Sequence, residues 1–525
     1  MARRSRFQSL LGLVVATAAI SCSMASAPAQ ASPTWLAAKT VSGPDFMATL
    51  GAKVVVDRFG NATAVWLRSA SGVGLLEAAH RPAGGTWSEP QTVSDLDHYA
   101  QGADVVVDDK GTVTAVWWAS APGEHDQIES ARRKLGGSWS SPTLVGLSDL
   151  GAPRVAVDHS GQVTAVWLQL RSGKYAVSTS TLAPGGYWSL AKTLSNLAYG
   201  SVSPAVAADR KSGMTVATWM SNDGVHSVIW ASRRPSGGTW STPQQVSESG
   251  QDANNNPQVT VDNLGNATIV FGRYDSGSHD TYVSSSTPTG AWSTPEPLSD
   301  PANFVTVQVV TTTAKGQTVA AWTEYRGGFF VVRASVRSQG GWSAAVSLSD
   351  EAYNAASIAT GVAPDGSTYV MWHLVPTYTL QIVRRTAGGA WSSTKDLGSD
   401  SLPSLDPVHS IGVDAGGNAV VAYEETSTQA RRVRVRALDR AGPVVSSLTV
   451  PGSALPRSSA RFSVKAKDTW SKIASYQWRF GDGTKAKGRT TSHAYARPGT
   501  YRVKLTIRDA VGNVTTRSKI VRVGR

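Results

Sequence analysis

Short stretches of apolar residues, separated by polar turns, recur along most of the chain with a fixed period. The segment VVVDRFGNATAVW, which ends at Trp66, returns as VVVDDKGTVTAVW at Trp117 and as VAVDHSGQVTAVW at Trp167. Weaker copies end at Trp219, Phe271, Trp322, Trp372 and Tyr423. In all eight copies the aromatic residue lies six positions after a glycine, and successive aromatics are 50 to 52 residues apart. A repeat of this length predicts one supersecondary unit per copy, because each unit must stack on its neighbours to bury its apolar faces.

Each copy divides into four predicted strands. The first has the form V-x-V-Asp and leads into an Asp-x-x-Gly turn, with Asp and Gly at positions that a type I turn prefers. The second, such as 62–67, is apolar at nearly every position, as expected where both faces of a sheet are covered. The third runs to a Gly-Gly turn, and the fourth carries a Gly-x-Trp-Ser element. Four short strands per copy are typical of a β-propeller blade.

The two ends of the repeated region complement each other. Trp35 lies 52 residues before Trp87, and its surroundings TWLAAKTVS match TWSEPQTVS, so the chain begins this region with an isolated fourth strand. The last copy, over 411–438, has three strands and lacks the Trp-Ser element. We expect the N-terminal strand to complete the last blade, which leaves no open sheet edge. The predicted fold is all-β, an eight-bladed propeller over 32–440; seven blades is the alternative if the last copy packs elsewhere.

A different pattern begins after residue 440. Residues 476–484 read YQWRFGDGT, and the stretch HAYARPGTYRVKLTIRD follows over 493–509. Strict alternation of Val503, Leu505 and Ile507 predicts a half-buried strand, and the GDG sequence predicts a tight hairpin turn.

These motifs closely resemble the polycystic kidney disease (PKD) domain family. The resemblance implies an immunoglobulin-like β-sandwich of seven strands over 441–525, with Trp478 and Tyr501 in its core. It also implies a spacer or adhesive module of an extracellular protein.

The first 31 residues have the features of an export signal. Arginines at 3, 4 and 6 precede an apolar run over 10–20 and then small residues up to Ala31, after which we expect cleavage. The predicted product is secreted, extracellular or associated with the cell surface. The only cysteine, Cys22, follows Ala-Ile-Ser, which loosely resembles a lipoprotein acylation box, so lipid attachment at Cys22 is the alternative. No other apolar run approaches the length of a transmembrane span.

Basic charge is concentrated in the C-terminal region. Residues 441–525 contain 17 Lys and Arg against three Asp, a net charge of +14, whereas the whole chain carries +13. Such an excess attracts polyanions through a salt-sensitive interaction. We expect an anionic cell-wall polymer as the partner, and no base-reading motif suggests nucleic acid. The alternative is a basic solvated surface without a partner.

Residues that recur in the copies are interpreted as structural. The repeated aspartates occupy turn positions where their carboxylates accept backbone N–H groups, and the tryptophans fill the space between blades. These aspartates are Asp57, Asp108, Asp158, Asp262 and Asp414. Nucleophile elbows, phosphate loops and His-Glu-x-x-His metal motifs are absent from the sequence, and no metal or cofactor is expected.

The repeats resemble sialidase-like and lectin-like propellers in architecture only. The Asp-x-Gly-x-Thr-Trp box of sialidases is missing, and the runs 324–326 (EYR) and 423–425 (YEE), which contain acids beside a tyrosine, lie at the ends of predicted second strands. We interpret both runs as packing elements. The chain is therefore more consistent with a binding protein than with an enzyme.

Candidate binding residues lie in the loops between copies and between second and third strands. Both sets of loops are expected on one face of a propeller. Aromatic rings beside carboxylates suit sugars, whose C–H faces stack and whose hydroxyls form hydrogen bonds. The candidates are Tyr99, Tyr199, Phe304, Tyr353, His125, Asp126, His226 and Asp280. The alternative is that these rings anchor loops onto neighbouring blades.

The sequence thus predicts a secreted, non-catalytic protein that binds carbohydrate or protein at the cell surface. A glycoside hydrolase or lyase of sialidase-like shape is one alternative. A structural, adhesive surface protein without a small ligand is the other.

Overall fold

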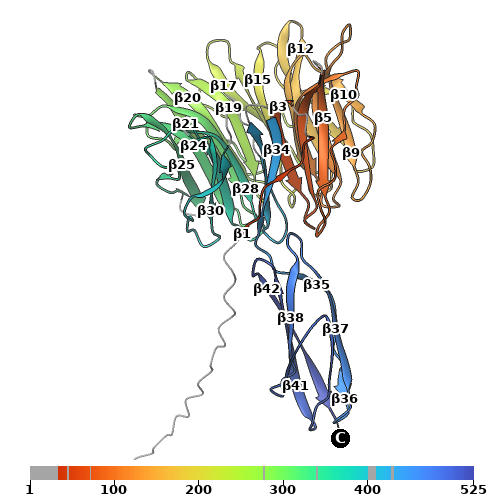
Figure 1. Ribbon diagram of the computed structural model, residues 1–525. Coiled ribbons are helices and arrows are strands. Elements are labelled where there is room, and N and C mark those ends of the chain that lie inside the picture. The colour runs from red at the N-terminus through yellow and green to blue at the C-terminus, as the bar shows by residue number, and fades with distance from the viewer. Residues whose placement is uncertain are drawn as a thin grey trace, which may run out of the picture.

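The computed structural model is built from β-strands throughout (Figure 1). The structure describes residues 34–43, 47–70, 73–275, 278–338, 341–375, 377–399, 410–426 and 431–524. The predicted export signal, with Cys22 and Ala31, lies outside the described residues. Within the described ranges, no helix has the length and apolar character needed to cross a membrane.

The strands up to β34 form eight antiparallel sheets, which we number 1 to 8 along the chain. In sheets 1 to 5 four strands are hydrogen-bonded in chain order. Their strands are β3 (Met47–Val56), β4 (Ala62–Ala70), β5 (Val73–Arg81) and β6 (Gln91–Thr92) in sheet 1; β7 (Tyr99–Val107), β8 (Val113–Ser120), β9 (Gln127–Arg133) and β10 (Thr143–Leu147) in sheet 2; β11 (Leu150–Val157), β12 (Val163–Arg171), β13 (Lys174–Leu182) and β14 (Lys192–Thr193) in sheet 3; β15 (Ser201–Ala208), β16 (Thr215–Asn222), β17 (Ser227–Arg234) and β18 (Gln244–Gln245) in sheet 4; and β19 (Asp252–Val261), β20 (Ala267–Asp275), β21 (Ser278–Ser286) and β22 (Glu296–Pro297) in sheet 5.

Sheets 6 and 7 follow the same order, and sheet 8 combines the two ends of the repeated region. Their strands are β23 (Val305–Thr312), β24 (Thr318–Arg326), β25 (Phe329–Ser338), β26 (Gly341–Trp342) and β27 (Val346–Ser347) in sheet 6; β28 (Ala355–Val362), β29 (Thr368–Leu374), β30 (Thr379–Arg385) and β31 (Lys395–Ser399) in sheet 7; and β32 (Ser410–Val413), β33 (Ala419–Thr426) and β34 (Arg431–Asp439) with β1 (Thr34–Trp35) and β2 (Lys39–Thr40) in sheet 8.

The N-terminal strand completes the last sheet, as the sequence predicts. Trp35 pairs with Leu438, and Lys39 pairs with Val435 farther along β34. The first strand of each sheet contacts the first strand of the next sheet, and β32 contacts both β28 and β3. The arrangement of the sheets is propeller-like.

The two ends of the sheets form two distinct faces. The loop face carries the connections between sheets and those between second and third strands. The turn face carries the Asp-x-x-Gly and Gly-Gly turns. Because the strands are antiparallel, every sheet contributes to both faces in the same way.

The repeated residues build the framework. In the turn after β3, the N–H of Gly60 donates to the carbonyl of Asp57 at 3.0 Å, and Gly60 has a φ of 87°. The carboxylate of Asp57 accepts the N–H groups of Phe59 and Asn61. The second-strand tryptophans that lie six residues after a glycine are fully buried, whereas those of the Gly-x-Trp-Ser elements are half-buried between sheets. The predicted structural roles of both sets are confirmed.

The C-terminal region is a sandwich of two sheets. One contains β35 (Val444–Thr449), β37 (Ala460–Lys467) and β40 (Thr490–His493); the other contains β36 (Ser453–Ala454), β42 (Val514–Val523), β41 (Gly499–Asp509), β38 (Ile473–Arg479) and β39 (Lys485–Lys487). Eight described strands replace the seven expected, because short β36 pairs in parallel with β42. Trp478 is fully buried as predicted, while Tyr501 is half-buried and stacks on Tyr495.

The sandwich is attached at the turn face, beside sheets 8 and 1 (Figure 1). Trp470 leaves the sandwich and joins the hydrophobic core between these sheets. Its ring lies under the guanidinium of Arg81, 4.0 Å from the ring centre, and Arg81 also donates to the carbonyl of Thr469 at 2.8 Å. The loop face is therefore left free of the sandwich.

Candidate functional site

The eight candidate binding residues lie at the loop face but in different sheets. Tyr99 begins β7, Asp280 lies near the start of β21, and the other six lie in loops before β9, β15, β17, β23 and β28. His125, Phe304 and Tyr353 are exposed, whereas Asp280 is buried and faces Arg273 in the strand register. The carboxylate of Asp280 is thus withdrawn from solvent.

Some of the predicted rings pack on the preceding sheet. Tyr99 lies over Gly74 of sheet 1, where an added Cβ would come within 3.1 Å of the ring. Phe304 packs edge-on against His279 of sheet 5 at a centroid distance of 4.4 Å, and His279 in turn contacts Tyr274. For Tyr99 and Phe304 the loop-anchoring alternative agrees with these contacts.

A variable position faces the packing aromatic of each second strand. The residue paired with that aromatic on the third strand is Glu77, Glu129, Ser178, Trp230, Tyr282, Arg333, Gln381 and Arg434 in sheets 1 to 8. The framework residue is nearly constant, whereas its partner changes in size, polarity and charge. Differences between the sheets at the loop face therefore begin at this pair.

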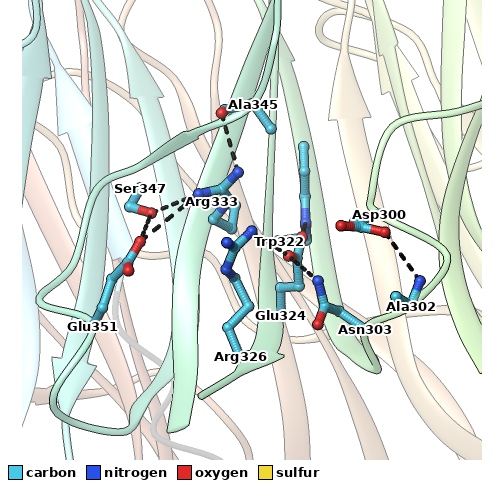
Figure 2. Close-up of polar contacts among 10 residues, drawn as sticks. All are labelled: Asp300, Ala302, Asn303, Trp322, Glu324, Arg326, Arg333, Ala345, Ser347 and Glu351. Carbon is cyan, nitrogen blue, oxygen red and sulfur yellow. Dashed lines mark hydrogen bonds and ion pairs between the residues drawn. The ribbon is translucent and has the colours of Figure 1, made fainter.

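In three sheets a buried carboxylate accepts the indole N–H of the packing tryptophan. Trp66 donates to Glu77 at 3.1 Å and Trp117 to Glu129 at 3.0 Å. In sheet 6, Trp322 donates to Glu324 at 2.9 Å (Figure 2). A contact that recurs in this way stabilises the sheet, because the carboxylate satisfies a buried donor.

The acid and arginines of sheet 6 are held by structural contacts. Glu324 is 1% exposed and accepts the Asn303 amide at 3.0 Å, with Arg326 at 3.4 Å (Figure 2). Arg333 donates to Ser347 and to the Ala345 carbonyl, and its contact with Glu351 spans 3.9 Å. Asn303 and Arg326 contact Oε1 of Glu324, and the Trp322 indole donates to Oε2, so both oxygens are engaged. This supports the packing interpretation of the run 324–326.

In sheet 2 a histidine contacts one of these buried carboxylates. His98 Nδ1 lies 2.6 Å from Glu129, and its Nε2 lies 3.6 Å from Glu124. Burial lowers the pKa of His98, but the hydrogen bond and charge of Glu129, with the charges of Glu124 and Asp95, outweigh it and raise the pKa. Asp95, His98 and Glu129 present ligand atoms within 4.8 Å of one another. Both Glu129 oxygens already accept hydrogen bonds, from Trp117 and Gln127, so a hydrogen-bond network explains the cluster.

Sheet 4 differs because Trp219 faces a second tryptophan, Trp230. A groove of about 550 Å³ opens beside this pair. It is lined by aromatic and polar residues of sheet 4 and of the loop leading into it: Leu194, Ser195, Asn196, Tyr199, Trp219, Ser221, Asn222, Asp223, Trp230, Thr242, Pro243 and Gln245. Tyr199 is the candidate residue that the structure places in this groove.

The groove offers both stacking surfaces and hydrogen-bonding groups. Among the described residues, the indole N–H groups of Trp219 and Trp230 have no protein partner. The N–H groups of His226 and Val225 donate to Asp223 and lower its pKa, so this carboxylate is charged at neutral pH. The ammonium of Lys174 lies 6.0 Å from the Tyr199 ring centre.

Sequence reasoning found Tyr199 but missed Trp230, Asp223 and the neighbouring amides. The signal was present, because Trp230 lies eleven residues after Trp219, where sheet 1 has Glu77 eleven residues after Trp66. Alignment of the copies at this position shows that Trp230 is an aromatic residue where sheet 1 has a carboxylate. The depth of the groove could not be read in this way, because it depends on how sheets 3 and 4 pack.

The C-terminal sandwich presents a basic surface. All described Lys and Arg side chains over 441–524 are exposed, whereas Asp468 and Asp509 are buried. On the larger sheet, Lys485 pairs with Arg479, which in turn pairs with Lys504, so three cations lie side by side on adjacent strands. Like charges directly opposite on neighbouring strands destabilise a sheet.

Comparison with known proteins identifies the C-terminal region. Residues 440–523 match the PKD domain family, which confirms the resemblance seen in the sequence. Collagenase ColA of Clostridium perfringens (strain 13 / Type A) is 41% identical over 59 residues. These residues are 11% of this chain and 5% of the collagenase, so the chain spans only a small part of that relative.

Two solved structures illustrate the likeness of the repeated region. Polysaccharide lyase Uly1 is 11% identical, with 77% of this chain and 99% of the lyase covered and a TM-score of 0.45. The β-propeller domain of the Trilobed protease from Pyrococcus furiosus is 8% identical, with 67% and 100% covered and a TM-score of 0.40. At these identities and TM-scores, the likeness says nothing about the activity of this chain.

Proposed function

We propose that this chain is a secreted, non-catalytic binding protein. Its propeller recognises carbohydrate or protein at the cell surface through the loop face, and its basic PKD domain attaches it to an anionic surface polymer. The groove of sheet 4, with two unpaired indole donors beside Tyr199 and Asp223, is the observation that carries the proposal.

In this proposal the export signal is removed after Ala31, and each of the eight sheets is one blade of a propeller over 32–440. The PKD domain occupies 441–525. The pairing of β1 with β34 and the contacts of β32 with both β28 and β3 support eight blades. A seven-bladed arrangement would leave sheet 8 outside this cycle of contacts.

The chemistry of the groove fits a sugar ring. Trp230 and Tyr199 offer faces on which the C–H surface of a pyranose stacks. The indole N–H groups donate to sugar hydroxyls, while Asp223 accepts from them. Exposed Tyr353 and His125 lie at the same face in other sheets and are available to a larger glycan or a protein.

The position of the PKD domain fits the second half of the proposal. It is attached at the turn face, so a surface polymer bound to the domain leaves the loop face accessible (Figure 1). The cationic row of Lys485, Arg479 and Lys504 matches the repeating charge of an anionic polymer. A binding role explains why these mutually repelling side chains are adjacent.

The groove is tested by glycan-array binding followed by calorimetry with the best ligand. Trp230→Ala and Tyr199→Ala are each expected to weaken binding about tenfold, because each removes one stacking face. Tyr187→Ala is the matched control, since this ring is exposed beside the Gly-Gly turn at the turn face and does not line the groove. Unchanged binding by both groove variants would overturn the groove as the binding site. Failure of the wild type to bind any glycan would favour a structural, adhesive protein.

The surface attachment is tested by deletion of 441–525. Retention on isolated cell walls should be lost in this variant, and moderate salt should release the full chain by screening its charges. Retention that withstands both treatments would contradict the role of the basic domain.

His98 supports a second candidate function, a glycoside hydrolase or lyase. Its imidazole is oriented by buried Glu129 and approaches Glu124, an arrangement compatible with proton transfer. Release of new reducing ends from a polysaccharide, abolished by His98→Ala, would replace the non-catalytic proposal with this one.

A further inference from the structure

Two grooves flank sheet 8, where the N-terminal strand completes it. The first, of about 610 Å³, lies between sheets 7 and 8 and has Trp35 in its wall. The second, of about 440 Å³, lies between sheets 8 and 1 and has Trp87 in its wall, with Trp470 of the PKD domain. Arg436 of β34 lines both grooves, so they are adjacent, and we call them the rim grooves. They share no lining residue with the groove of sheet 4.

The walls of the rim grooves are rich in cations. Among the described residues, no Asp or Glu lines either groove. The repeated region as a whole is negatively charged, because the +14 of residues 441–525 exceeds the +13 of the full chain and the predicted export signal is itself positive. These cations are therefore concentrated against the overall charge of the repeated region. They are Lys39, Arg81, Arg384, Lys395 and Arg436.

Only part of this charge is balanced within the protein. Arg384 lies 3.5 Å from Asp365, and buried acids at the junction with the PKD domain act on Arg81. The other three cations form no ion pair with a carboxylate of the described ranges; they are Lys39, Lys395 and Arg436. Like charges in adjacent grooves repel one another, and an anionic ligand relieves this repulsion.

Backbone carbonyls hold Arg436 between the two grooves. Its Nε donates to the carbonyl of Leu36 at 2.8 Å, and its Nη1 donates to the carbonyl of Leu397. These bonds fix the guanidinium between the N-terminal segment and sheet 7, but a neutral carbonyl does not cancel its charge. Because the cation is already in place, a ligand loses less free energy in ordering it.

The rim grooves also offer aromatic and hydroxyl groups. The rings of Trp35 and Trp87 are half-buried, so each keeps an accessible part in the groove that it lines. Exposed Ser392, Ser393 and Thr86 add hydroxyl groups. Aromatic faces suit the C–H surface of a sugar ring, and hydroxyls exchange hydrogen bonds with sugar hydroxyls. An anionic polymer without sugar rings would leave both tryptophans unused.

We propose that the rim grooves bind a polyuronate, a linear polysaccharide whose sugar rings carry carboxylates. The planar guanidinium groups of Arg384 and Arg436 match the planar carboxylate, and the ammonium groups of Lys39 and Lys395 add point charges. The site is separate from the loop face and from the cationic row of the PKD domain, so it adds a function to those proposed above.

A polymer in the rim grooves would bridge several parts of the chain. It would contact sheets 7, 8 and 1, the N-terminal strand and Trp470 of the PKD domain. β1 lies at the edge of the repeated region from which the PKD domain extends (Figure 1). Since the ligand binds the assembled grooves, it should also stabilise the pairing of the N-terminal strand with β34.

The site is tested by calorimetry of the full chain, without its export signal, with a galacturonate hexamer. Lys39→Gln/Lys395→Gln should weaken binding about tenfold, because it removes two unpaired charges. Both lysines are exposed, so this variant should keep the wild-type melting temperature. Lys134→Gln/Lys192→Gln removes the same charge outside the grooves and should bind as the wild type does. Lys192 is a close match, since it lies four residues after Trp188 as Lys39 lies four after Trp35.

Hydrogen exchange locates the bound hexamer. The N–H groups of Leu36 and Val41 donate to carbonyls of β34, and the hexamer should slow their exchange in the wild type. The slowing should be lost in Lys39→Gln/Lys395→Gln and should persist in Lys485→Gln/Lys504→Gln. The opposite result would overturn the rim grooves and leave the attachment through the PKD domain standing.

Other outcomes would also overturn the proposal. Wild-type affinity in Lys39→Gln/Lys395→Gln is one. Tighter binding of dextran sulfate or of single-stranded oligothymidylate than of galacturonate at equal charge is another, because it would assign the grooves to sulfate esters or to nucleic acid. If the lysine variant does not fold, exchange in the wild type decides, and the absence of slowing at Leu36 and Val41 overturns the proposal.

Discussion

Sheets 2 and 4 use the same packing tryptophan in different surroundings. In sheet 2, Trp117 donates its indole N–H to Glu129, and His98 also contacts the Glu129 carboxylate. In sheet 4, Trp219 faces Trp230, and a groove opens where the carboxylate would be. The comparison shows that the packing tryptophan of the second strand stays the same while the residue paired with it on the third strand varies. That paired residue decides whether a groove opens beside the tryptophan.

Substitution of a packing tryptophan is expected to have the largest effect on stability. Trp322→Ala should lower the free energy of unfolding by about 3–5 kcal/mol, because it leaves a cavity and removes a donor from buried Glu324. Trp342→Ala in the same sheet should cost less, since this ring is only half-buried. Urea unfolding of the two variants measures both losses of stability. Equal losses would contradict the distinction between the fully buried second-strand tryptophans and the half-buried tryptophans of the Gly-x-Trp-Ser elements.

The variable side is tested by Trp230→Glu, which gives sheet 4 the carboxylate of sheet 2. The new carboxylate should accept the indole N–H of Trp219 and remove the stacking face. We expect glycan affinity to fall about tenfold or more, while the free energy of unfolding changes by about 1 kcal/mol or less. Calorimetry and urea unfolding measure the two quantities, and unimpaired binding would show that the groove is not the site.

The stability that His98 contributes in sheet 2 should depend on pH. Since the pKa of His98 is raised in the folded protein, its contribution to stability is complete below pH 6.5 and is lost as pH rises through the raised pKa. His98→Gln should flatten the stability profile in this window. Urea unfolding across the window provides the measurement, and a wild-type profile as flat as that of the variant would refute the role of His98.

A substitution in the PKD domain is expected to have the smallest effect on stability, and to stabilise the protein rather than destabilise it. Lys504→Gln should raise the free energy of unfolding by about 0.2–1 kcal/mol, because repulsion from Arg479 is relieved. The same substitution should weaken retention on cell walls. Arg461→Gln is the control for charge alone, since its strand partner is Ser492. A loss of stability in Lys504→Gln would contradict the mutual repulsion of Lys485, Arg479 and Lys504.

Much of the fold could be predicted because its signals are local and repeated. The glycine six residues before each aromatic locates a turn and a buried strand at once, and the match between the surroundings of Trp35 and Trp87 predicts the pairing of β1 with β34. The site was predicted less well. Tyr199 lines the groove, but buried Asp280 and the packed ring of Tyr99 look the same in sequence as exposed loop residues.

The sequence by itself determined the strands, the turns, the closing partner of the last sheet and the basic character of the PKD domain. The strands and turns depend on residues within one copy, and the closing partner follows from the likeness between the surroundings of Trp35 and Trp87. Spacing, likeness between copies and charge are therefore enough to predict these features. Tertiary structure decided that Trp230 opens a groove, and that Asp439 meets Asp468 and Asp509 at the junction with the PKD domain. These features arise between segments far apart in the chain, where only the packing of one sheet or domain on another sets burial and distance.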